Sequence, residues 1–210
     1  MLNVDPHPLL DALAFTSRWP APLQELDAPA ARAFLDLSAE APLVAGDDVR
    51  LAVRELLRQG GFKPTGRSKP ASEYLLKAVA EGWLSPSSGI NPAVDVCNAV
   101  SLHSGLPISV VDAELAAGPW RLGLCPTGTC YAFNPSGQVL DLGGLLALHD
   151  AEGPCGSPVK DSQRTKTHGL TRETLTVIWG TQALPGRSEA ALAWYLELLS
   201  ELGVESSPWR

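Results

Sequence analysis

Four stretches of the chain place apolar residues three and four positions apart, the spacing that puts them on one face of a helix. The clearest is 188–202, where an apolar stripe follows Ser188 as the capping residue and Gly203 ends the pattern. The other predicted helices cover 47–59, 71–81 and 91–104. Three of the four therefore lie in the first half of the chain.

Short apolar runs separated by turn residues come next, and they predict strands. We expect strands at 108–111, 120–124, 130–133, 138–140, 145–149 and 175–179. The order is thus helices, then short strands, then a closing helix. Because strands and helices do not alternate, the predicted class is α+β.

The first 46 residues are rich in Pro, Ala and Leu. Short helical patterns occur around Pro8–Phe15 and Ala28–Leu37, and prolines interrupt them. We therefore expect residues 1–46 to form an N-terminal helical extension packed on a domain of residues 47–210, the whole being a single compact unit.

The composition is that of an ordinary globular protein, with 45 % hydrophobic and 19 % charged residues. The net charge of −7 argues against a dedicated high-affinity nucleic-acid binder, because phosphate binding draws on Lys and Arg. Local basic strips remain candidates, and solvated surface charge explains them equally well. The first strip is Lys63, Arg67, Lys69 and Lys77, and the second is Lys160, Arg164, Lys166 and His168.

Several kinds of site are not indicated. The four cysteines form no CxxC pair and have no histidine at zinc-finger spacing, so we expect reduced thiols and no metal. No nucleotide-binding glycine motif or hydrolase elbow occurs, and no cofactor is expected. Without a signal peptide or an apolar run of 18 residues, the expected compartment is the cytoplasm, with no membrane contact.

Polar residues inside apolar segments mark three places where chemistry could occur. Asp95 and Asn98 lie three apart in the predicted helix 91–104, so they share a face, and His103 ends that helix. The strand that begins at 108 carries Ser109 and ends at Asp112. The segment 160–167 is dense in charges and hydroxyls, which suits a phosphate or a ribose. Internal capping, an ordinary strand and a surface loop are the structural alternatives.

These three features, in this order, resemble the B3/B4 family, the editing and tRNA-binding module of phenylalanyl-tRNA synthetase β subunits. The segment NPAVDVCNAVSL at 91–102 resembles the family helix I-N-x-x-V-D-x-x-N-x-V-S-L. The segment 105–112 resembles its G-x-P-x-x-x-x-D strand, and 160–167 with Thr174 resembles its R-D-S-x-x-T-K-V…T segment. Upstream, 69–77 resembles P-S-x-E-x-L-L-R. The resemblance extends over roughly residues 50–200.

The resemblance implies an unusual β-sandwich core flanked by helices. It also implies hydrolysis of a wrongly attached amino acid, tyrosine or another non-cognate one, from the 3′ end of a tRNA, which is double-sieve editing. We expect a free-standing form that acts in trans on aminoacyl-tRNA, with an aminoacyl-tRNA synthetase as a further candidate partner. A non-catalytic tRNA- or RNA-binding module and an adaptor that docks on the translation machinery are the alternative functions.

The family motifs also imply site residues. The catalytic candidates are Asn98 and Ser109, near the reacting ester, and Asp112. The substrate-binding candidates are Asp95, His103, Arg121, Asp161, Ser162, Thr165 and Lys166.

The sequence departs from the family pattern at three positions. Ser109 stands where bacterial synthetase modules usually carry a histidine, and Gly123 and Thr129 stand where many free-standing relatives carry an arginine and a glutamate. Arg121 lies on the same predicted strand face as the missing arginine. These departures predict an altered amino-acid preference or a loss of hydrolysis.

Overall fold

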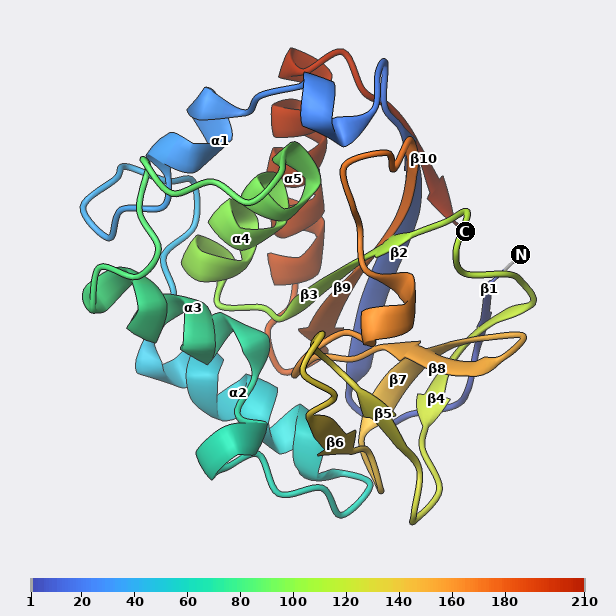
Figure 1. Ribbon diagram of the computed structural model, residues 1–210. Helices are drawn as coiled ribbons and strands as arrows, with labels where there is room; N and C mark the ends of the chain where they lie inside the picture. Colours follow the sequence, from blue (N-terminus) through green and yellow to red (C-terminus); the bar gives the residue numbers. More distant parts are fainter. Residues whose placement is uncertain (1, 210) are drawn as a thin grey trace.

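Two four-stranded sheets form the centre of the computed structural model, which describes residues 2–209 (Figure 1). The first sheet has the order β1 (Leu2–Val4), β4 (Trp120–Leu124), β7 (Leu146–Asp150) and β8 (Gly153–Gly156). The second has the order β10 (Glu205–Trp209), β2 (Leu10–Arg18), β9 (Glu173–Thr181) and β3 (Ile108–Asp112). A separate hairpin consists of β5 (Cys130–Ala132) and β6 (Val139–Asp141).

The helices lie mostly on one side of the second sheet (Figure 1). They are α1 (Pro29–Ala33), α2 (Asp47–Arg58), α3 (Ala71–Ala80), α4 (Pro92–Ser104) and α5 (Arg187–Glu201). Short 3₁₀ turns occur at η1 (Leu23–Glu25), η2 (Gly66–Ser68) and η3 (Gln163–Thr165). None of the helices in residues 2–209 combines the length and the apolar character needed to cross a bilayer.

The hydrophobic core has two parts because the second sheet is covered on both faces. Along β9, Leu175, Val177 and Trp179 pack toward the first sheet, where they meet residues such as Leu122. Ile178 belongs to the other part, together with the buried faces of α4 and α5. The arrangement is therefore a β-sandwich flanked by helices, and the predicted α+β class is confirmed.

The predicted helices and strands outside the first 46 residues are present, with ends that differ by at most two residues. The helix expected around Pro8–Phe15 is wrong, because residues 10–18 form strand β2. This strand lies between β9 and β10 in the sheet (Figure 1). The helix expected at Ala28–Leu37 is present only as the short α1. Residues 2–18 thus contribute strands to both sheets and do not form a helical extension.

The turn from α4 into β3 fixes the geometry of the region described next. Asn91 caps α4 by accepting a hydrogen bond from the Val94 amide at 3.1 Å. Gly105 ends the helix with φ = +69°, and a Cβ there would lie 2.8 Å from a methyl group of Val49. The chain can therefore reverse from α4 into β3 within a few residues, which brings the polar positions of both elements to one place.

Candidate functional site

A cavity of about 500 Å³ lies where α4, β3, segment 160–167 and the β5–β6 hairpin meet. Its wall includes apolar side chains, namely Ala71, Ile90, Val94, Cys97, Ile108, Val110 and Phe133. The polar part of the wall consists of Asn91, Asn98, Asn134, Lys160, Asp161, Lys166 and Thr167. Three residues expected in the site from the sequence, Asn98, Asp161 and Lys166, are therefore brought together from two distant segments.

Helix α4 and its capping residue supply two of the three side-chain amides of this cavity. Most of α4 is buried, but Asn98 is only half-buried and lines the cavity one turn from Val94. Asn91 donates a hydrogen bond from Nδ2 to the hydroxyl oxygen of Thr167 at 3.2 Å. This contact joins the start of α4 to the segment that carries Asp161 and fixes the two sides of the cavity relative to each other.

Asp161 is the acidic group of the cavity. Its Oδ1 accepts a hydrogen bond from the Ser157 amide at 3.0 Å, and the carboxylate also bonds to the Ser109 hydroxyl. Desolvation raises the pKa of Asp161 to about 6, although these hydrogen bonds and the positive charge of Lys166 act in the opposite direction. The group therefore changes its charge just below neutral pH.

Two lysines border the cavity and contact the same phenylalanine. Lys166 donates from Nζ to the Phe133 carbonyl oxygen at 2.6 Å. Lys160 places its Nζ 4.1 Å from the centre of the Phe133 ring and 5.0 Å from that of Tyr74. Burial lowers the pKa of Lys160, and so do the charges of Arg67 and Lys166.

The other two catalytic candidates are buried and do not line the cavity. Ser109 is fully buried; its Oγ accepts from the indole Nε1 of Trp179 at 2.9 Å and donates to the Ser157 carbonyl oxygen at 3.2 Å, and the hydroxyl also contributes to lowering the pKa of Asp161. Ser109 thus sits directly behind the carboxylate that the cavity exposes.

Asp112, also fully buried, holds the turn after β3. It accepts hydrogen bonds from the amides of Glu114, at 2.8 Å, and Leu115, at 3.1 Å, and from the Thr171 hydroxyl. The His168 Nε2 lies 3.3 Å from Oδ2, the oxygen that also accepts from Thr171, whereas both amides donate to Oδ1. Both carboxylate oxygens of Asp112 therefore already have partners within the protein.

Two further binding candidates lie away from the cavity. His103 is buried, with Nε2 at 2.7 Å from the Phe34 carbonyl oxygen, and its ring packs against Phe34 and Trp194. Arg121 projects from β4 in the first sheet and pairs with Asp5.

Ser162 and Thr165 also have local structural bonds. The Ser162 hydroxyl accepts from the Arg164 amide and so caps η3, and Thr165 donates to the Cys155 carbonyl oxygen at 3.1 Å. Both side chains are buried. They shape the segment on which Asp161 and Lys166 are presented.

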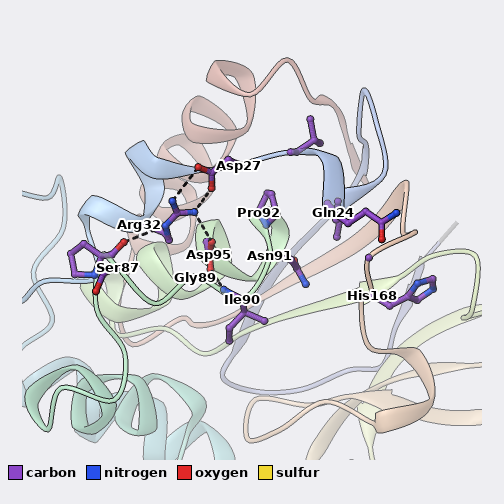
Figure 2. A pocket seen from close by; sticks show the side chains of 14 residues that line it. Gln24, Asp27, Arg32, Ser87, Gly89, Ile90, Asn91, Pro92, Asp95 and His168 are labelled. Atoms are coloured by element: carbon purple, nitrogen blue, oxygen red, sulfur yellow. Dashed lines mark hydrogen bonds and ion pairs between the residues drawn. The ribbon is translucent and has the colours of Figure 1, made fainter.

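A second, more polar cavity of about 570 Å³ contains the remaining candidate, Asp95 (Figure 2). Asp95 is 1 % exposed and accepts from the Ile90 amide at 2.9 Å. Arg32 reaches between Asp95, at 3.4 Å, and Asp27. Desolvation raises the pKa of Asp95, whereas the amide bond and Arg32 lower it. Ile90 and Asn91 line both cavities, so the two are neighbours.

Sequence reasoning missed three contributors to this region. Arg32 lies in the N-terminal stretch and gave no motif. Asn91 was placed only as the first residue of the predicted helix and its motif, and neither its capping role nor its bond to Thr167 was predicted. Phe133 was assigned only to a strand, because nothing in the nearby sequence indicates that Lys160 and Lys166 contact it.

No family model and no curated protein sequence matches the chain. A solved N-terminal fragment of the phenylalanyl-tRNA synthetase β subunit from Pyrococcus horikoshii superposes with a TM-score of 0.50 at 12 % identity. The fold resembles that of a synthetase fragment. The match covers 98 % of this chain and 50 % of the other, so this chain spans about half its length. At this identity the likeness shows the fold alone.

Proposed function

We propose that the cavity formed by α4, β3 and segment 160–167 receives the aminoacylated 3′ end of a tRNA and hydrolyses its ester in trans. The observation that carries the proposal is the composition of the wall, in which an amide, a carboxylate and an ammonium group face a largely apolar chamber. This combination suits an amino-acid side chain joined to a polar ester and ribose. The likeness to a synthetase β-subunit fragment supports the same class of ligand.

In the proposed reaction, Asp161 acts as the general base. It takes a proton from a water molecule as the water oxygen bonds to the ester carbonyl carbon. A base with a pKa near 6 is largely ionised at neutral pH and still accepts a proton efficiently. The carbonyl oxygen gains negative charge in this step, and the Asn98 amide is the nearby donor that would stabilise it.

Collapse of this tetrahedral intermediate breaks the bond to the ribose oxygen. The proton held by Asp161 passes to that oxygen, so the products are the free amino acid and the tRNA hydroxyl. Lys166, fixed by Phe133, lies at the cavity wall where the ribose and its phosphate would rest. In this scheme Ser109 is a positioning residue, because it contacts Asp161 from behind and has no access to the cavity.

Deacylation of a panel of labelled aminoacyl-tRNAs tests the proposal. The panel includes Tyr-tRNA and non-cognate aliphatic pairs. We expect rapid release from at least one misacylated pair, and a loss of roughly 100-fold or more in kcat/KM for Asn98→Ala and Asp161→Asn. Asn3→Ala and Asp47→Asn, at exposed positions on other elements, are the matched controls.

Full activity of Asn98→Ala would remove Asn98 from the scheme, and the same result for Asp161→Asn would remove the base. Absence of release from every pair, with tRNA still retained on a filter, would favour a non-catalytic tRNA-binding module. One observation favours that second function: Ser109 and Asp112, two of the three catalytic candidates, are fully buried and hydrogen-bonded within the protein.

A further inference from the structure

Some Lys and Arg side chains of this acidic protein form ion pairs with carboxylates, and others do not. In the two basic strips considered from the sequence, Lys77 pairs with Glu81 and Arg164 pairs with Asp150. Four other cations, drawn from both strips, have no carboxylate within 4 Å of their charged groups among residues 2–209. We call these four the basic rim: Arg67, Lys69, Lys160 and Lys166.

The fold brings the two halves of the basic rim together from separate parts of the sequence. The Ala71 amide donates to the Pro158 carbonyl oxygen at 2.9 Å, which holds the loop before α3 against the segment that carries Lys160. The Tyr74 hydroxyl donates to the Gly66 carbonyl oxygen, and Lys160 lies over the Tyr74 ring. The basic rim therefore borders the cavity on the side of Ala71 and Phe133.

The charges of the basic rim repel one another in the free protein. Burial is the largest cause of the lowered pKa of Lys160, and the positive charges of Arg67 and Lys166 lower it further. Asp161 attracts Lys166, although the two do not form one of the ion pairs found within residues 2–209. An anion that bound among these groups would relieve this repulsion. The arrangement therefore favours a ligand with several closely spaced negative charges.

We propose that the basic rim is the contact surface for the phosphates of a single-stranded RNA end, whose 3′ terminus enters the adjoining cavity. The choice of RNA rests on the proposed function, and the cation arrangement is independent of it. The net charge of −7 repels a long duplex, so the attraction is confined to the few phosphates next to the terminus. The aromatic rings of Tyr74 and Phe133 beneath Lys160 hold its ammonium group at the cavity mouth.

The salt dependence of RNA binding tests this surface. The probe is a 5′-fluorescein RNA hairpin with a single-stranded 3′-CCA end and no amino acid, followed by fluorescence anisotropy between 50 and 200 mM KCl. Each phosphate contact on a single strand contributes a slope of about −0.7 in log K against log salt. We expect Arg67→Gln and Lys160→Gln each to weaken binding and to reduce the slope by about 0.7.

Two controls separate charge from structure. Lys77→Gln removes the same charge from an ion-paired position on α3 and is expected to leave the slope unchanged. Lys160→Arg keeps the charge and is expected to restore the slope lost in Lys160→Gln. If Lys160→Gln fails to fold, Arg67→Gln at an exposed position and Lys69→Gln at a half-buried one give the same test.

Unchanged slopes in Arg67→Gln and Lys160→Gln would overturn the inference, and so would equally tight binding of a blunt hairpin without the overhang. The two proposals fail separately. Deacylation without these slope changes would leave the proposed function standing and remove the basic rim. The slope changes without deacylation would leave the RNA surface standing and remove the hydrolase.

Discussion

Replacing Asp161 by asparagine is expected to stabilise the protein at neutral pH and to change nothing in acid. Desolvation raises the pKa of this carboxyl from an ordinary 3.8 to about 6 in the folded chain. Between these two pKa values the folded state holds the proton and the unfolded state does not, so stability falls as the pH rises through this window. Above pH 6 the full cost of keeping the carboxylate charged is present.

The magnitude follows from the same two pKa values. A pKa change from 3.8 to about 6 corresponds to about 3 kcal/mol in the free energy of unfolding. We take this as an upper value, because the side chain is only half-buried and water at the cavity wall reduces it. Asparagine has the same shape and can keep the bond from the Ser157 amide. The expected gain of Asp161→Asn is therefore about 1 to 3 kcal/mol at pH 7 and close to zero at pH 4.

Urea unfolding followed by tryptophan fluorescence at pH 4, 5, 6 and 7 measures this difference. Asp47→Asn, whose side chain is 86 % exposed, is the control and is expected to show little dependence on pH. A stability difference for Asp161→Asn that stays constant or shrinks as the pH rises would refute the reasoning. If Asp161 is also the general base, wild-type kcat/KM rises with pH and levels off above about 6.

Three further substitutions test the surroundings of the cavity. Ser109→Ala leaves the buried Nε1 of Trp179 without an acceptor and is expected to cost about 1 to 3 kcal/mol in urea unfolding; an unchanged midpoint would contradict this. Asp112→Ala removes the acceptor of two backbone amides and a hydroxyl, and thermal unfolding should show a loss of about 2 to 4 kcal/mol. Gly105→Ala forces a side chain to φ = +69° and against Val49, and is expected to destabilise by about 1 to 3 kcal/mol by the same measurement.

Most elements could be predicted because each has a local pattern. Helix α5 has a clear apolar stripe, and β9 has an apolar run at 175–179 that only Thr176 interrupts. Strand β2 could not be predicted, because it is an interior strand covered on both sides and so does not alternate apolar with polar residues. Its apolar residues happen to fall at helical spacing, and only pairing with distant strands makes it extended. The short β10 has too few apolar residues to be found locally.

The candidate site was predictable only in part, because a local motif identifies polar residues but not the direction in which each side chain points. Asn98, Asp161 and Lys166 lie on one cavity wall, as expected from motifs on two segments. Ser109 and Asp112 were expected beside them because both are polar residues in the strand segment 105–112, which resembles the family's strand motif. The sequence does not say which polar residue faces solvent and which bonds inward. That depends on the indole of Trp179 in one case and on the turn after β3 in the other.

The position of β2 has a consequence for how the chain folds during synthesis. Leu10 pairs with Thr181, and Arg18 pairs with Glu173. Strand β2 is therefore synthesised early but cannot pair with β9 until residues 173–181 have been synthesised. Contacts so distant in sequence slow folding, because a large loop must close before they form. A nascent chain stalled before residue 173 would expose an unpaired apolar strand, and such chains should depend on chaperones until β9 emerges.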